Sequence, residues 1–225
     1  NHQLRFLKVN QYEHNISISA KEKNMIKVCI LDYGSGNVGS VNNLIKYLNY
    51  ECIVSNDIKE IENSSHIILP GVGAFGAAMQ KIKKNIPIDT FENEVLVKKK
   101  PFLGICVGMQ VLADKGEEFG EHDGLGWIKG KVVKLNSRIL PHIGWNDITI
   151  KNNSTIFNGL GKYKDFYFVN SFHFDVHEKN FIIAETEYDQ NFCSAVQKGN
   201  IIGVQFHPEK SQKTGQILIK NFLNL

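Results

Sequence analysis

The stretch Phe102-Leu103-Gly104-Ile105-Cys106-Val107-Gly108-Met109-Gln110 decides the fold class of this 225-residue chain. Residues 102–105 predict a short buried strand, and residues 107–115 predict the helix that follows it. Between them lies Gly-x-Cys-x-Gly, the pattern of a nucleophile elbow with cysteine in place of serine. Side chains in place of the two glycines would clash at such a sharp turn. The Cys106 thiol would lie at a helix N-terminus, where the dipole stabilises a thiolate. The alternative is a buried core cysteine that happens to lie between two glycines.

Apolar strand-like runs alternate with helix-like segments on both sides of this stretch. Strands are predicted at 26–32, 51–55, 66–69, 102–105, 127–135, 166–169, 181–186, 192–196 and 201–206. Helices are predicted at 40–48, 76–84, 89–99, 107–115 and 212–222. The alternation predicts an α/β fold with a mainly parallel central sheet flanked by helices and extra C-terminal strands.

The composition is that of an ordinary globular domain, with 42% hydrophobic and 22% charged residues. A net charge of +3 is too small to suggest nucleic acid or an anionic membrane as a partner. No apolar stretch has the length of a membrane span, and the start of the chain lacks the apolar core of a signal peptide. The four cysteines are widely spaced, which is typical of reduced thiols in a cytoplasmic protein. The histidines lack metal-ligand spacing, so we expect no metal and no cofactor.

Residues 1–24 are polar and show no periodicity, whereas Met25 opens an apolar run. We therefore expect an extension over 1–24, either added sequence, a native upstream segment or a flexible arm. The remaining residues, 25–225, are expected to form one domain.

Two further motifs follow predicted strands. His207 comes after the apolar run 201–206, and Glu209 lies two residues beyond it across Pro208. A cysteine nucleophile needs a base, and the base needs a group that orients it. The third motif is the glycine-rich loop 70–76, whose backbone N–H groups can approach a ligand closely. Alone, His207 could be an ordinary loop residue and 70–76 a connecting turn, but the three motifs together favour a catalytic site.

Together these motifs resemble the class I, triad-type glutamine amidotransferases, over about residues 25–225. The resemblance implies that Cys106 is the nucleophile, His207 the acid–base and Glu209 the orienter in hydrolysis of the glutamine side-chain amide. It implies an oxyanion hole at Val72, Gly73 and Val107. The glutamine-binding residues implied by the family are Gly71, Gln110, Glu118, Ser171 and Phe172.

Finer features are similar to the branch of this family that serves histidine biosynthesis. They are Asp32–Asn37, Pro70–Phe75, Pro141–Asn146, Phe168–Phe172 and His207–Ser211. In that branch a cyclase-type synthase subunit forms a heterodimer with the glutaminase and uses its ammonia to make imidazole glycerol phosphate and AICAR. The resemblance implies that Asn37, Trp145 and Lys210 lie at the partner interface.

Two positions depart from the family pattern, since Asn170 replaces a more usual His and Phe172 a more usual Tyr. Paralogues of the branch supply ammonia for surface-sugar modification, and the segment 172–174 leaves that alternative open.

Three other functions compete with this one. Residues 34–39 match Gly-x-Gly-x-x-Gly after a strand, the fingerprint of a dinucleotide-binding protein. That interpretation leaves Cys106 and His207 unexplained. The second alternative is an esterase of the α/β-hydrolase type with a cysteine nucleophile. It is disfavoured because the acid precedes the base along the chain of those enzymes, whereas here Glu209 follows His207. A binding module without turnover is disfavoured by the complete set of catalytic residue types.

Overall fold

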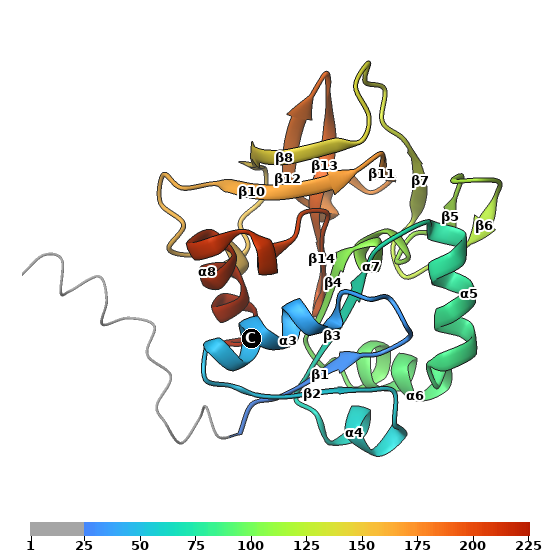
Figure 1. The fold of residues 1–225 in the computed structure, drawn as a ribbon, viewed down its shortest axis with the longest axis vertical. Coiled ribbons are helices and arrows are strands. Elements are labelled where there is room, and N and C mark those ends of the chain that lie inside the picture. The colour runs from blue at the N-terminus through green and yellow to red at the C-terminus, as the bar shows by residue number, and fades with distance from the viewer. Residues whose placement is uncertain (1–24) are drawn as a thin grey trace, which may run out of the picture.

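The computed structural model describes residues 25–225, and the extension expected at 1–24 lies outside the described residues. An eight-stranded sheet forms the centre of the described chain (Figure 1). In spatial order its strands are β2 (Glu51–Ser55), β1 (Lys27–Leu31), β3 (His66–Gly71), β4 (Phe102–Cys106), β14 (Ile201–Val204), β13 (Gln190–Lys198), β12 (Ile182–Tyr188) and β9 (Thr149–Ile150). The first five are parallel and the last three continue the sheet antiparallel.

Two smaller sheets of the C-terminal half lie beyond the central sheet. One pairs β8 (His142–Asp147) with β10 (Asp165–Asn170). The other contains, in spatial order, β11 (Phe172–Val176), β7 (Gly130–Lys134), β5 (Lys115–Gly116) and β6 (His122–Asp123). The predicted mainly parallel sheet with extra C-terminal strands is therefore confirmed.

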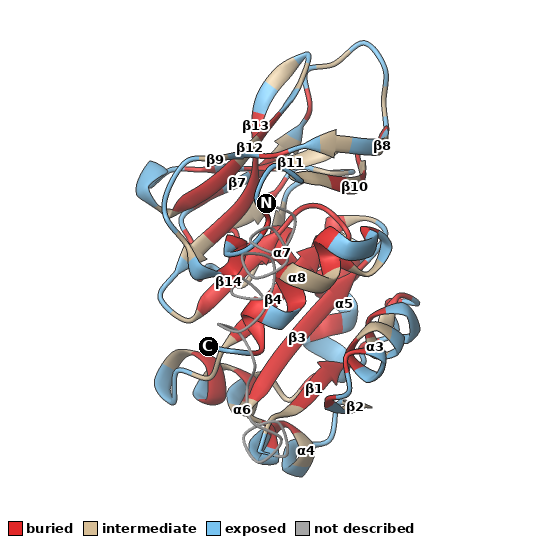
Figure 2. Ribbon diagram, turned by 90° about the vertical axis from the view of Figure 1, so that its left-hand side faces the viewer, coloured by how far each residue is buried: buried red, intermediate tan, exposed pale blue. Residues whose placement is uncertain are grey.

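Helices cover both sides of the central sheet, with α8 and α5 on opposite sides in Figure 1. The α-helices are α3 (Val38–Tyr47), α4 (Ile58–Asn63), α5 (Phe75–Asn85), α6 (Ile88–Glu92), α7 (Val107–Gln110) and α8 (Gln212–Phe222). A π-helical turn, η1 (Asn93–Val97), continues α6, and 3₁₀ turns occupy η2 (Thr155–Phe157), η3 (Lys179–Phe181) and η4 (Pro208–Lys210). Strands β3, β4 and β14 are buried along their whole length (Figure 2), which explains their continuous apolar sequences.

The helix predicted over 107–115 is wrong in its length, because α7 ends at Gln110. The carbonyls of Val111, Leu112 and Ala113 accept hydrogen bonds from the amides of residues 125, 128 and 126, respectively. A helix would need those carbonyls for amides four residues further on. The chain instead turns and enters β5, so tertiary hydrogen bonding overrides the helical pattern.

The strand predicted at 127–135 is shorter, and is confined to β7. Trp127 precedes it and packs on Phe91 and Phe102 in the core, with ring centroids 5.0 and 5.4 Å away. Strand β8 was not predicted. Its alternating apolar residues, Ile143 and Trp145, are exposed rather than buried, and the glycine between them is depleted in strands.

Candidate active site

Cys106 ends β4 and precedes α7 in a backbone conformation that only a constrained turn holds, with φ 55° and ψ −112°. The glycines beside it are required sterically. A Cβ at Gly104 would lie 2.4 Å from the carbonyl oxygen of Gly108. A Cβ at Gly108 would lie 1.8 Å from the carbonyl oxygen of Leu69, on the neighbouring strand β3. The clash predicted for larger residues in this motif is therefore present.

His207 and Glu209 lie beside this elbow, in the segment that follows β14. His207 Nδ1 and Glu209 Oε1 are 2.8 Å apart, and both side chains are buried. The same carboxylate oxygen accepts a 3.0 Å hydrogen bond from Asn37 Nδ2. The His207 backbone is fixed in turn, because its N–H donates to the carbonyl of Tyr167 at 2.8 Å. The imidazole is thus held by one charged group and by the strand β10.

His207 and Glu209 each stabilise the charged form of the other. Burial lowers the pKa of His207, but Cys106 and Glu209 outweigh that effect and raise it to about 10. Burial alone would raise the pKa of Glu209, but His207 and Asn37 hold it below its usual value. At neutral pH the arrangement therefore favours a protonated imidazole beside an ionised Glu209 carboxylate, and such a pair next to a cysteine is the setting in which a thiol acts as a nucleophile.

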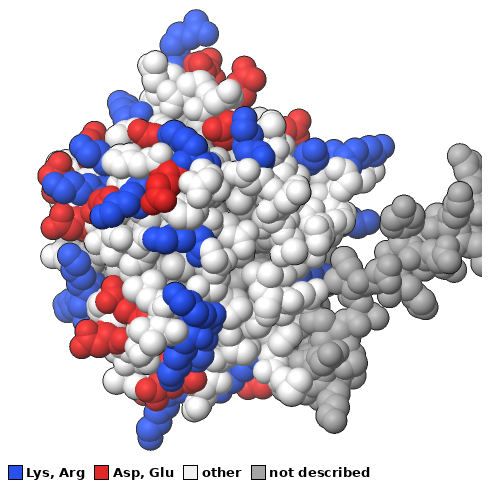
Figure 3. All heavy atoms as spheres, turned by 180° about the vertical axis from the view of Figure 1, so that it is seen from behind, with Lys and Arg blue, Asp and Glu red and all other residues white. Residues whose placement is uncertain are grey.

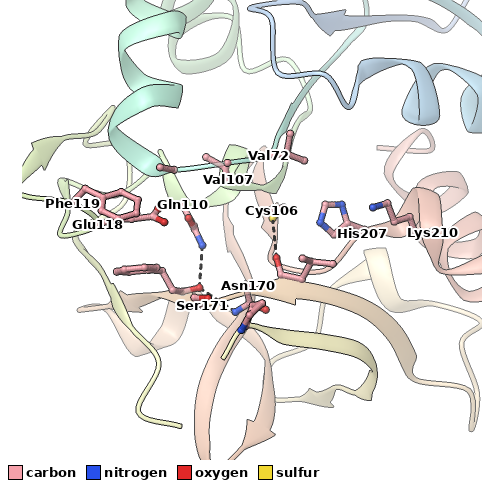
Figure 4. A pocket seen from close by; sticks show the side chains of 15 residues that line it. Val72, Cys106, Val107, Gln110, Glu118, Phe119, Asn170, Ser171, His207 and Lys210 are labelled. Atoms are coloured by element: carbon pink, nitrogen blue, oxygen red, sulfur yellow. Dashed lines mark hydrogen bonds between the residues drawn. The ribbon is translucent and has the colours of Figure 1, made fainter. Parts of the chain in front are cut away.

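A cavity of about 340 Å³ opens above Cys106 (Figure 4). It is large enough for a small amino acid and is bounded by the elbow, the glycine-rich loop and the segment between β10 and β11. Its lining comprises Val72, Gly73, Ala74, Cys106, Val107, Gln110, Glu118, Phe119, Pro141, Val169, Asn170, Ser171, Phe172, His207 and Lys210. Ten of these residues were predicted from the sequence, and the structure brings them together from separate elements.

Four predicted residues lie outside the lining. Glu209 lies behind His207, and Asn37 points inward to Glu209 although it was predicted at the partner interface. Gly71 is buried at the end of β3, where a Cβ would lie 2.5 Å from the Tyr33 hydroxyl. Trp145 lies on β8 and remains 45% exposed. The interface roles of Asn37 and Trp145 stay predictions.

The predicted oxyanion residues line the cavity from two neighbouring segments, the elbow and the glycine-rich loop. Val107 is the first residue of α7, so its N–H has no partner within that helix. Val72 is exposed, and Gly73 has φ 92°, a conformation that favours glycine. The loop therefore combines exposed backbone with a residue that permits a change of peptide orientation.

Predicted glutamine-binding side chains are partly engaged within the protein. Gln110 Nε2 donates to the carbonyl oxygen of Phe172 at 3.1 Å. Glu118 Oε2 accepts from the N–H of Phe75, at the first residue of α5, at 3.0 Å. The backbone carbonyl of Ser171 accepts from Leu135 at 2.9 Å. These bonds fix the walls of the cavity before any ligand enters.

The sequence analysis gave no site role to four lining residues, although all except Phe119 fall in segments that it singled out: Ala74, Phe119, Pro141 and Val169. Phe119 has φ 57° and is 88% exposed, which is unusual for a large aromatic residue. A conformational strain of this kind leaves no signal in the sequence. Pro141 and Val169 belong to segments that resemble the family, but proline and valine carry no functional group that would mark them individually as site residues.

The other three cysteines lie in or against the core and are not further nucleophiles. Burial raises the pKa of the Cys29 and Cys52 thiols to about 12, and it raises the pKa of the Cys193 thiol as well. Within residues 25–225, no group of three His, Cys, Asp or Glu side chains is arranged to hold a metal ion. No helix of the described chain has the length and apolar character needed to cross a membrane.

Basic and acidic side chains are intermixed on the face of the molecule seen in Figure 3.

Comparison with known proteins adds the family context. The model of the family Glutamine amidotransferase class-I matches residues 29–225. The chain is 43% identical to the imidazole glycerol phosphate synthase subunit HisH of Pelagibacter ubique, covering 89% of this chain and 100% of the relative. It is 45% identical to the HisH subunit of Pyrococcus furiosus, with 89% and 100% covered.

Solved structures share the fold at much lower identity. PurLQS from Thermotoga maritima gives a TM-score of 0.69 at 18% identity, with 89% of this chain and 98% of that chain covered. A glutamine amidotransferase from the same organism gives 0.62 at 18% identity, with 84% and 79% covered. At these identities the likeness supports the fold alone.

Proposed function

The chain belongs to the class I glutamine amidotransferases, and from that membership we propose that it hydrolyses glutamine at Cys106 and delivers the ammonia to a cyclase-type synthase subunit. The acceptor reaction we propose is the formation of imidazole glycerol phosphate and AICAR in histidine biosynthesis. Identities of 43–45% over the full length of HisH subunits carry this assignment. A reaction that needs a free thiolate suits a reducing compartment, so we propose a cytoplasmic location.

The proposed reaction begins with the thiolate of Cys106, which attacks the side-chain carbonyl carbon of glutamine. His207 holds the thiol proton and gives it to the departing nitrogen, so ammonia leaves and a γ-glutamyl thioester remains. Water then attacks the thioester, with His207 accepting its proton, and glutamate is released. Support for these roles comes from the 2.8 Å contact of His207 with Glu209 and from the raised pKa of the imidazole.

The negative oxygen formed in each attack needs hydrogen-bond donors. We assign the N–H of Val107 as one donor and an N–H of the loop at Val72 and Gly73 as the other. Removal of one such donor typically costs about 100- to 1000-fold in rate. Because Gly73 can change its peptide orientation, the second donor can form when the partner engages the loop. The isolated chain would then waste little glutamine.

Selection of glutamine is proposed to rest on Gln110, Glu118, Ser171 and Phe172, which line the cavity. The partner interface is proposed to include Trp145 and Lys210. Support comes from their shared contact with Tyr167. The rings of Trp145 and Tyr167 meet edge-on at 6.1 Å, and Lys210 Nζ lies 5.8 Å from the Tyr167 ring.

The test measures glutamate formation by the chain alone, with the cyclase subunit, and with the cyclase and its nucleotide ligand. We expect a low rate alone and a strong increase in the full mixture. A fully active isolated chain that the partner does not accelerate would exclude gating. Transfer of ammonia to a surface-sugar intermediate, with none to the histidine-pathway nucleotide, would favour the paralogous function. Binding of NAD without any glutaminase activity would support the dinucleotide alternative instead.

Cys106→Ala is the matching variant. It should abolish glutamine hydrolysis, because no other thiol lines the cavity among the described residues. Partner binding should be retained, and the partner's reaction with free ammonia should continue. Residual hydrolysis in this variant would contradict the role of Cys106.

A further inference from the structure

Two buried glutamines connect the wall of the cavity to the sulfur of Cys106. Gln205 lies just before His207 in sequence and has no exposed surface. Its Nε2 donates to Cys106 Sγ at 3.6 Å, and its Oε1 accepts from Gln110 Nε2 at 3.0 Å. The same nitrogen of Gln110 donates to the backbone carbonyl of Phe172. The result is a continuous chain of hydrogen bonds from a backbone carbonyl to the nucleophile.

The direction of this chain is set by its first member. A backbone carbonyl can only accept, so the amide nitrogen of Gln110 must face Phe172. The second hydrogen of that nitrogen then points at Gln205, which must present its oxygen. The nitrogen of Gln205 is thereby turned toward the sulfur. The alternative orientation would oppose two donors at one contact and place a carbonyl oxygen against a thiolate.

We propose that Gln205 stabilises the Cys106 thiolate directly and that Gln110 is the positioning residue that keeps its amide turned to the sulfur. This inference rests on the proposed function of Cys106 as nucleophile. When the thiol proton passes to His207, the negative charge remains on Sγ and the N–H of Gln205 faces it. Hydrogen bonds to an ionised partner are about twice as strong as neutral ones. The same bond favours the thiolate again when the thioester breaks.

The contact with Gln205 differs from the one that the sulfur makes with a backbone carbonyl. Cys106 Sγ lies 3.9 Å from the carbonyl oxygen of Val169, which can accept from a thiol but can offer nothing to a thiolate. The Gln205 amide and the Val169 carbonyl therefore favour opposite charge states of Sγ. Loss of the Gln205 donor would leave His207 as the group that favours the thiolate, against the Val169 carbonyl, which favours the protonated thiol.

Alkylation by iodoacetamide tests the proposal without glutamine or a partner. The rate at Cys106 is followed from pH 5 to pH 10, with the adduct located by mass spectrometry. Gln205→Met keeps the length of the side chain and removes the donor. We expect the rate constant at pH 7 to fall about tenfold and the midpoint of the profile to rise by about one pH unit. An unchanged profile in a folded variant overturns the proposal.

Gln197→Met is the matched control. Gln197 lies in β13, the strand next to β14, and accepts from Ser154 Oγ without lining the cavity. Its profile should coincide with that of the unchanged chain, and a shift as large as that of Gln205→Met would overturn the assignment. Gln110→Met leaves the donor in place but frees its orientation, so a smaller rise of the midpoint is expected. No rise would show that Gln110 does not position Gln205.

Cys29 and Cys193 are buried in the folded protein, so their alkylation would reveal that Gln205→Met does not fold. In that case Gln205→Glu is used in its place. That variant keeps the acceptor for Gln110 but presents a carboxylate oxygen to the sulfur. It should raise the midpoint by more than one pH unit, and no rise overturns the proposal. Glutaminase assays with the cyclase partner separate the two levels of inference. Inactivity of the unchanged chain there would overturn the proposed function, while the alkylation comparison would still decide whether Gln205 acts on the thiol.

Discussion

Substitution of Gly108 by alanine should damage catalysis more than stability. A Cβ there would lie 1.8 Å from the Leu69 carbonyl oxygen, about 1.5 Å closer than the roughly 3.3 Å at which carbon and oxygen ordinarily approach. The nearest atoms are backbone, so no side chain can rotate away. Helix α7 must move away from β3, and such overpacking costs about 1–3 kcal/mol of folding stability.

The same movement displaces the N–H of Val107, the residue immediately before. Oxyanion donors act at about 2.7–3.1 Å, and a misplacement of about 1 Å can cost about 100-fold in rate. We therefore expect Gly108→Ala to lower kcat for glutamine hydrolysis by about 100- to 1000-fold in the presence of the partner. Thermal unfolding measured in parallel should show a folded protein with a lower Tm.

Gly39→Ala provides the control. Gly39 lies in α3 and a Cβ there would meet no atom within 4 Å. Because glycine is about 0.5–1 kcal/mol less favourable than alanine in a helix, this variant should keep full activity and gain stability. A Gly108→Ala protein with normal kcat would refute the steric reasoning, and with it the requirement for glycine at the elbow.

Two further predictions concern protons. Glu209→Gln removes a carboxylate that helps to raise the pKa of His207, so the alkaline limb of kcat/KM should move to lower pH and activity should fall by up to about 10⁴-fold; an unmoved limb would contradict the role of Glu209. Burial lowers the pKa of His66 to about 4, below its value near 6.5 in the unfolded chain, so stability should be lost as pH falls through that window, by on the order of 3 kcal/mol. Urea unfolding of the unchanged chain and of His66→Phe would show it, since the variant should lack this part of the slope.

The catalytic motifs could be predicted because of where they fall relative to the strands. The loop after β3, Cys106 at the end of β4 and His207 after β14 each follow a buried apolar run. Parallel strands bring their carboxyl ends to one edge of a sheet. In the observed order β3, β4 and β14 are neighbours, with Gly71 opposite Cys106 and Val204 opposite Ile105. Alternation of strands and helices predicted this edge, although it did not predict the neighbours.

Contacts between distant polar side chains could not be predicted in the same way. Asn37 and Glu209 are 172 residues apart, and neither the glycine-rich sequence around Asn37 nor its position after a strand indicates that its amide bonds to the triad. The contact of Gln205 with Cys106 could not be predicted either, since a single glutamine in an apolar run gives no periodic pattern that indicates its partner. Such contacts depend on the packing of whole elements, which local sequence patterns do not determine.

The departure at Asn170 gains a physical meaning from these contacts. Asn170 Nδ2 donates to the Phe172 carbonyl at 3.0 Å, and that carbonyl also accepts from Gln110. A longer histidine at position 170 would not reproduce the short bond to a carbonyl two residues further on. In this chain the amide thus helps to fix the acceptor from which the hydrogen bonds run to Gln205 and Cys106. Asn170→His should therefore change the pH profile of Cys106 alkylation more than it changes the KM for glutamine. An unchanged alkylation profile together with a raised KM would contradict this.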